Sequence, residues 1–237
     1  MKRNPIASRL ALFAGTFLLT LASIAAVAQD ETRTFSLSNF DKVSLGSAFT
    51  ISVRQGSNYS VKASGRKQDI DDLEANVSGG TLVVRYRQNM RRNNRERVNI
   101  DVVMPALRGA DLSGASTSTI TGFRKQDALD LSVSGASTST IDVDADRLTM
   151  DLSGASNVTL KGRADKVKGD VSGATRLRAY DLKTETATVD ASGASSVQIN
   201  AAKELTVEAS GASSVRYKGA PSISSNTSGA SSVRRDG

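Results

Sequence analysis

The chain has 237 residues, with 31 lysines and arginines against 24 aspartates and glutamates, and it contains no cysteine, histidine or tryptophan. These absences exclude the usual zinc site, a thiol nucleophile and a serine–histidine–aspartate triad, so any catalysis would depend on Asp, Glu, Lys, Arg, Ser or Tyr. Aromatic residues make up only 4% of the chain, which argues against broad stacking platforms for single-stranded nucleic acid.

Residues 1–28 predict a secretory signal peptide. Lys2, Arg3 and Arg9 precede an apolar run from Leu10 to Val27, and Ala28 completes a small-x-small cleavage site. An uncleaved membrane anchor is the alternative, because the run is just long enough to span a bilayer. Removing the three charges leaves 28 basic against 24 acidic residues, which takes away the compositional support for nucleic-acid binding. We expect export to the periplasm or cell surface of a Gram-negative bacterium, with no transmembrane segment in the mature chain.

Residues 29–105 predict irregular N-terminal β rungs. Apolar and polar residues alternate over Phe49–Val53, Tyr59–Ala63 and Arg97–Val103, as in half-buried strands. Val77–Val84 contains a Ser-Gly-Gly that echoes a motif found later in the chain, and residues 69–75 predict one helical turn. We expect this region to form the irregular β cap of a single domain that also contains the remaining residues.

Residues 106–237 are organised by a repeat. Ser-Gly-Ala recurs with spacings of 21, 19, 19, 20, 18 and 18 residues, and the next residue is Ser in six copies and Thr in one. The motif serines are Ser113, Ser134, Ser153, Ser172, Ser192, Ser210 and Ser228. A motif used seven times indicates one structural unit repeated along the chain.

Apolar residues occupy the same positions in each repeat. Counted from the motif serine, they fall mainly at −5, −3, −1, +5 and +7, with polar residues between them. This alternation predicts two short strands per repeat with a glycine-containing bend between them. Because like residues recur at like positions, we expect the turns to stack in register. The fold class is therefore all-β, a single-domain parallel β-helix with about seven regular rungs.

The ordered motifs resemble one bacterial family. They are Phe40–Val43, then Phe49–Gly56, then Asp72–Leu82 and finally the Ser-Gly-Ala-Ser repeats, which together span residues 34–235. This combination resembles the auto-transporter adhesin, head GIN domain family. The resemblance implies an exported, β-helix-like protein, and it supplies no catalytic residues to transfer.

Position −2 of the repeats is predominantly acidic. Its five carboxylates are Asp111, Asp151, Asp170, Asp190 and Glu208. In stacked rungs they would lie about 4.8 Å apart on one outer face and raise one another's pKa unless neutralised. They predict either a Ca²⁺ ladder or a solvated acidic stripe paired with basic side chains.

A second candidate is an arginine-rich segment between two expected strands. It contains Arg85, Arg87, Arg91, Arg92, Arg95 and Arg97. Guanidinium groups match carboxylate, sulfate and phosphate groups, so the segment predicts contact with an anionic polysaccharide or another cell-envelope component. A solvated hairpin tip is the alternative.

Two functions fit these features. The first is a non-catalytic envelope or surface protein, an adhesin or glycan-contacting solenoid without a cofactor. The second is a polysaccharide lyase or hydrolase that uses Asp, Arg and Ca²⁺. The repeats contain no long interrupting loop from which a catalytic cleft would be built, so the sequence favours the first function. The natural ligand and the oligomeric state stay open.

Overall fold

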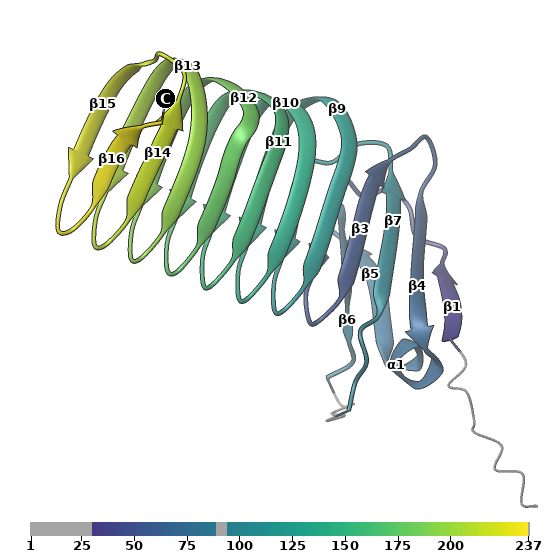
Figure 1. Cartoon of the computed structure of the whole chain (residues 1–237). Coiled ribbons are helices and arrows are strands. Elements are labelled where there is room, and N and C mark those ends of the chain that lie inside the picture. Colours follow the sequence, from purple (N-terminus) through teal and green to yellow (C-terminus); the bar gives the residue numbers. More distant parts are fainter. Residues whose placement is uncertain (1–29, 89–93, 237) are drawn as a thin grey trace, which may run out of the picture.

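A computed structural model describes residues 30–88 and 94–236. The predicted signal peptide lies outside these residues. Within the described ranges, sixteen strands form one hydrogen-bonded sheet that winds into a solenoid with a β cap at its N-terminal end (Figure 1). The predicted all-β, parallel β-helix architecture is confirmed. Among the described residues the only helix is α1 (Lys67–Asp71), and none is long and apolar enough to span a membrane.

Five long parallel strands form the regular turns. They are β9 (Thr117–Val133), β10 (Thr138–Leu152), β11 (Asn157–Val171), β12 (Arg176–Ala191) and β13 (Ser196–Ala209). Each runs from one Ser-Gly-Ala corner to the next, so the strand that follows a corner continues into the strand that precedes the next one. The two separate strands predicted per repeat are therefore joined into one, and pairing continues around the bend with register shifts in every pair of long strands except β10 with β11.

The last turns consist of shorter strands, β14 (Ser214–Lys218), β15 (Ser222–Thr227) and β16 (Ser232–Arg235). Gly219 and Pro221 lie between β14 and β15. A proline cannot donate to a strand ladder, which explains why the long strand is interrupted here.

The corners stack as a column. Each motif glycine has a positive φ, from 68° to 79°, and the backbone N–H after it donates to the glycine carbonyl one rung below, as from Ala155 to Gly135 at 2.8 Å. A Cβ on Gly154 would lie 2.4 Å from that same carbonyl oxygen. The repeated glycine is therefore required both by the left-handed backbone and by the close approach of the next rung.

The core lies between the two faces of each turn. From β9 to β13, residues at positions −5, −3, −1, +5 and +7 point inward and stack in columns, as in the fully buried column Ile120, Ile141, Leu160, Ala179 and Ile199. At position +5 of the first two repeats the buried Ser118 and Ser139 hydrogen-bond each other, with Oγ atoms 2.7 Å apart. In three copies the serine after Ser-Gly-Ala closes its own corner by donating to the carbonyl of the motif serine, as Ser156 does to Ser153 at 2.8 Å.

The cap contains two further turns that are out of chain order. β2 (Lys42–Leu45) and β3 (Thr50–Gln55) stack directly on β8 (Gly109–Leu112) and β9. Outside them lie β6 (Thr81–Tyr86) and β7 (Asn99–Met104), which come later in the sequence. The chain thus fills the outer position after the inner one.

Antiparallel strands close this end. β4 (Ser60–Arg66) pairs with β7 and with β1 (Asp30–Phe35), and β5 (Leu73–Ser78) pairs with β6. Gly79 and Gly80 both have positive φ, the geometry of a tight two-residue hairpin turn. The segment Val77–Val84 is therefore a hairpin rather than a rung corner. The helical turn predicted at 69–75 begins earlier, because the alternating residues from Leu73 onward join β5.

Candidate functional site

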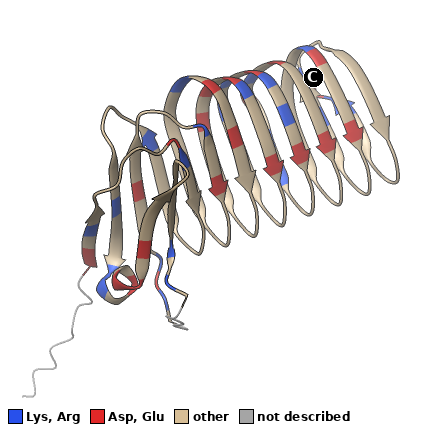
Figure 2. Cartoon of the chain, turned by 180° about the vertical axis from the view of Figure 1, so that it is seen from behind, with Lys and Arg blue, Asp and Glu red and all other residues tan. Residues whose placement is uncertain are grey.

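The acidic residues form the column that the sequence predicts. Position −2 is in register from Asp111 through Ser132, Asp151, Asp170 and Asp190 to Glu208. In Figure 2, red bands that mark Asp and Glu lie near the arrowheads of successive strands. All of them lie on the outer surface, and Ser44 Oγ of β2 donates to Asp111 Oδ2 at 3.2 Å.

The column has the expected electrostatic consequence at Asp190. Partial burial raises the pKa of this carboxyl, and the neighbouring carboxylates of Asp170 and Glu208 raise it further, whereas Lys168 opposes them. The described residues contain no group of three or more acidic side chains arranged to hold a metal ion. The Ca²⁺ ladder stays a prediction.

We call residues 85–97 the Arg loop: residues 85–86 end β6, and the following residues lead toward β7 at the capped end. Arg91 and Arg92 lie outside the described residues. Arg85 pairs with Glu74 at 2.5 Å, and Arg97 Nη1 donates to Thr117 Oγ1 at 3.2 Å. Arg87 is exposed and forms no ion pair with a described residue. The structure therefore places Arg87 and Arg97 at the surface of the cap.

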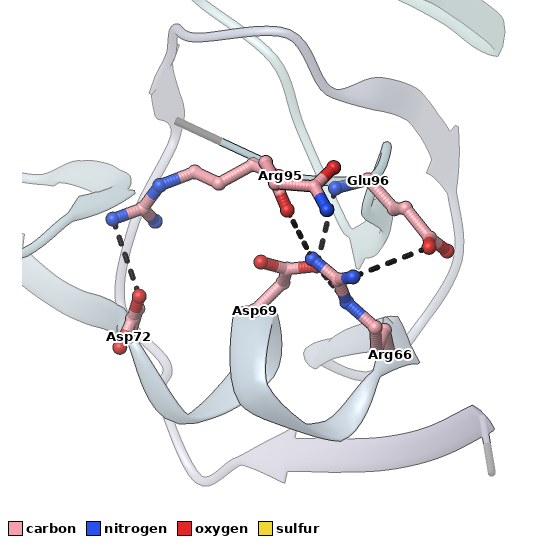
Figure 3. A network of polar contacts seen from close by, with 6 residues as sticks. Arg66, Asp69, Asp72, Arg95 and Glu96 are labelled. Atoms are coloured by element: carbon pink, nitrogen blue, oxygen red, sulfur yellow. Dashed lines mark hydrogen bonds and ion pairs between the residues drawn. The ribbon is translucent and has the colours of Figure 1, made fainter. Parts of the chain in front are cut away.

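Arg95 has a different environment from the other arginines. Its side chain is only 17% exposed, Nη2 lies 3.2 Å from Asp72 Oδ2, and the guanidinium carbon lies 3.8 Å from the centre of the Tyr86 ring. Figure 3 shows the side chain extended toward Asp72. An arginine stacked and paired in this way fixes the base of the loop.

A second ion-pair network fixes the same base from the other side. Asp69 of α1 is fully buried, and its Oδ2 accepts from Arg66 Nε at 2.8 Å and from the backbone N–H of Glu96 at 3.2 Å. Arg66 also contacts the Glu96 carboxylate at 3.3 Å and donates to the carbonyl of Asn94 (Figure 3). The helix thus anchors the end of the Arg loop that leads into β7.

The structure also contains a cavity that the sequence does not predict. It has a volume of about 550 Å³ and lies where the cap meets the first regular turn. Its walls come from the start of β2, the end of β3, residues 105–108 and the bend of β9 at residues 124–130. We call it the junction cavity. A shallower groove of about 410 Å³ adjoins it, shares Lys42 and Asp130 with it, and continues across the rungs to Asp170.

The described repeats contain no long interrupting loop, as the sequence indicates, and the junction cavity lies at their N-terminal edge. No long loop is needed, because a short irregularity in β9 and the edge of the cap together enclose the space. The available signal was the first repeat spacing of 21 residues, against 18 to 20 in the others. That spacing shows that the first turn is longer, but it does not show on which side the extra residues protrude.

The fold and its column of corners define an all-β solenoid with a capped N-terminal end. Residues 39–221 match the family model described as "Putative auto-transporter adhesin, head GIN domain". The chain belongs to this family, as its motifs predicted, and this membership indicates an exported or surface protein.

Solved structures share the fold. A "putative adhesin" from Bacteroides fragilis is 21% identical, with a TM-score of 0.83 over 88% of this chain and 97% of that one. A "putative lipid binding protein" from Parabacteroides distasonis is 18% identical, with a TM-score of 0.71 over 89% and 98%. A "putative adhesin" from Parabacteroides merdae is 14% identical, with a TM-score of 0.70 over the same shares. No curated protein matches the chain.

Proposed function

We propose that this chain is a non-catalytic adhesin of the cell envelope, held in the periplasm or at the cell surface, which contacts an anionic polysaccharide through the Arg loop. The family membership and the adhesins of the same fold support the adhesin role. The observation that carries the proposed contact is the position of the Arg loop. Six arginines fall within thirteen residues at the capped end, and the base of the segment is anchored by Arg95 and Asp69.

An anchored base with exposed arginines suits binding. Ordering a flexible loop costs conformational entropy on association, and a loop fixed at its base pays less of that cost. Guanidinium groups hydrogen-bond sulfate and carboxylate in a fork that lysine does not provide. Contact through such groups depends on charge, so it weakens as salt is added.

The test compares two triple variants on a heparin resin. Arg87→Ser, Arg91→Ser and Arg92→Ser together remove three charges from the Arg loop and leave Arg95 in place. Arg176→Ser, Arg178→Ser and Arg216→Ser remove three charges from exposed positions on the regular rungs. We expect the loop variant to elute at lower salt than the parent chain and the rung variant to elute with the parent.

Equal loss of retention in both variants would show that net charge alone holds the protein on the resin, and the Arg loop would then be rejected.

Two more measurements test the rest of the proposal. Falling viscosity of an anionic polysaccharide in the presence of the protein would show catalysis and overturn the non-catalytic role. Binding to anionic lipid vesicles in place of polysaccharide would overturn the choice of ligand.

A further inference from the structure

The junction cavity is built from side chains that hold its walls together. Gln55 Nε2 donates to the Pro105 carbonyl at 2.9 Å, and Gln55 Oε1 accepts from the Arg124 N–H at 3.1 Å. Gln126 Oε1 accepts from the Leu107 N–H at 3.0 Å, and Gln126 Nε2 donates to the Arg124 carbonyl at 2.7 Å. Two amides therefore cross-link β3, the segment before β8 and the bend of β9. The cavity is shaped before any ligand arrives.

Two register shifts occur in the bend of β9, and of the later pairs of long strands only β12 with β13 also has two. The pairing of β9 with β10 shifts register between Ile141 and Val143 and again between Val143 and Ala145, so β9 contains two more residues than β10 over the same span. β10 and β11 pair across this region without a shift. Lys125, in the second bulge, has a φ of 56°, which is uncommon for a residue with a side chain. Bulges of this kind re-aim side chains and occur often beside functional sites.

The charged groups that line the cavity fall into two sets. Arg124 is held by Asp142 through contacts of 2.9 and 3.0 Å, and Arg108 by Asp41 at 3.5 Å. Lys42 and Lys125 form no ion pair with a described residue, and neither do the other two charged lining residues, Asp127 and Asp130. The side-chain carbons of Lys42 lie against the backbone of Gly109: a Cβ added to this glycine would be 3.3 Å from Lys42 Cγ.

These groups specify the chemistry of a ligand. Two ammonium groups suit one carboxylate, whereas two carboxylates suit hydroxyl donors. Each wall glutamine also retains one amide N–H beyond the bond it makes to the chain. No aromatic residue lines the cavity within the described chain, so recognition would depend on charge and hydrogen bonds rather than ring stacking. A volume of about 550 Å³ lies within the usual range of about 300–1,000 Å³ for small-molecule sites.

We propose that the junction cavity binds one acidic sugar residue of a polysaccharide, with its carboxylate on Lys42 and Lys125 and its hydroxyl groups on Asp127 and Asp130. The adjoining groove is lined by Asp111, Asp151 and Asp170 and would repel a second carboxylate. The preferred polymer therefore has neutral sugars next to the acidic one. This inference rests on the proposed polysaccharide-binding function and adds a second contact separate from the Arg loop.

The experiment uses a disaccharide of glucuronic acid and glucose as the probe, with binding measured by calorimetry on the whole chain. We expect the parent chain to bind it, and Lys42→Gln with Lys125→Gln to weaken binding by about tenfold or more. Lys166→Gln with Lys183→Gln removes the same charge from exposed rung positions and is expected to bind as the parent does. Thermal melting of both variants checks that they fold.

If the parent chain binds the disaccharide, three results would still overturn this site. One is unchanged affinity in the cavity variant, and another is equal weakening in the rung variant. The third is displacement of the disaccharide by inorganic phosphate at equal concentration, which would identify a simple anion site. Tighter binding of a diglucuronate than of the mixed disaccharide would remove the role of the groove. Retention on heparin without disaccharide binding would reject the cavity and leave the Arg loop proposal standing. Disaccharide binding without retention on heparin would reject the Arg loop and leave the cavity standing.

Discussion

The regular rungs and the cap hold their shape by different means. In the rungs, each residue stacks on its equivalent in the next turn, and each corner depends on one glycine with positive φ. The closed end of the cap depends instead on individual contacts. The ion pairs around Asp69 and Arg95 hold one side, and ring contacts of Phe40 with Tyr59 and Phe49 with Tyr86 hold another. Repetition stabilises the interior of a solenoid, but its end must be closed by contacts specific to that end.

The largest expected effect separates a stacked glycine from an open one. Gly154→Ala places a Cβ 2.4 Å from the Gly135 carbonyl at a φ of 76°, and we expect it to lower the free energy of unfolding by about 3 kcal/mol or more. Gly79 in the cap hairpin also has positive φ, but a Cβ there would meet nothing within 4 Å. Gly79→Ala should therefore lower the free energy of unfolding by only about 1–2 kcal/mol.

Urea unfolding of the two variants measures both values. Similar losses would mean that backbone conformation alone explains the glycine column. The close approach of successive corners would then add nothing to the effect of backbone conformation on the free energy of unfolding.

The next effect tests the cap. Asp69→Ala leaves the Glu96 N–H without its acceptor, and we expect a loss of about 1–3 kcal/mol. Amide exchange at Glu96 should also become faster. Asp71→Ala on the same helix removes an exposed partner of Lys67 and should change nothing measurable. Unchanged exchange at Glu96 in Asp69→Ala would show that the helix does not anchor the Arg loop.

The sequence predicted the rungs because repeated residues carry their own register. Once like residues stack, the outward direction of Asp151 and Asp190 and the inward direction of Leu148 follow from period two. The cap could not be predicted in the same way. The outer place of β6 and β7 depends on strand pairing between distant segments. The burial of Arg95 depends on Asp72 and Tyr86, whose proximity only the folded chain establishes.

One rung corner was missed because its residues are exchanged. Gly46, Ser47, Ala48 and Phe49 occupy the place of a Ser-Gly-Ala-Ser corner between β2 and β3, since Leu45 pairs with Leu112 and Thr50 with Thr117. Ser47 has a φ of 72° where the other corners have glycine. The search for Ser-Gly-Ala could not find it, although Leu45 before it and Thr50 after it match the flanking residues of the first repeat.

This exchanged corner gives a prediction of opposite sign. We expect Ser47→Gly to raise the free energy of unfolding by about 0.5–1 kcal/mol, because glycine relieves the left-handed conformation by more than it costs in chain entropy. Ser134→Gly changes a corner serine that lies outside the positive-φ region. This variant should lower the free energy of unfolding by a similar amount. A loss in both variants would show that Ser47 is not strained.

The smallest effect concerns the acidic column, where repetition works against stability. Because the pKa of Asp190 is raised, the folded chain binds this proton more readily than the unfolded chain, so stability falls as the pH rises through that pKa. Asp190→Asn removes the repulsion from Asp170 and Glu208 and should raise the free energy of unfolding at pH 7 by a few tenths of a kcal/mol. The gain should vanish as the pH approaches about 4, where an ordinary aspartate protonates. Asp146→Asn, on the exposed bend outside the column, controls for the loss of one negative charge.

Calcium added at pH 7 tests the ladder in the same melts: stabilisation of the parent chain that is absent from Asp190→Asn would show that the column binds the ion. Equal behaviour of the two chains, with and without calcium, would mean that solvent and Lys168 already neutralise the column.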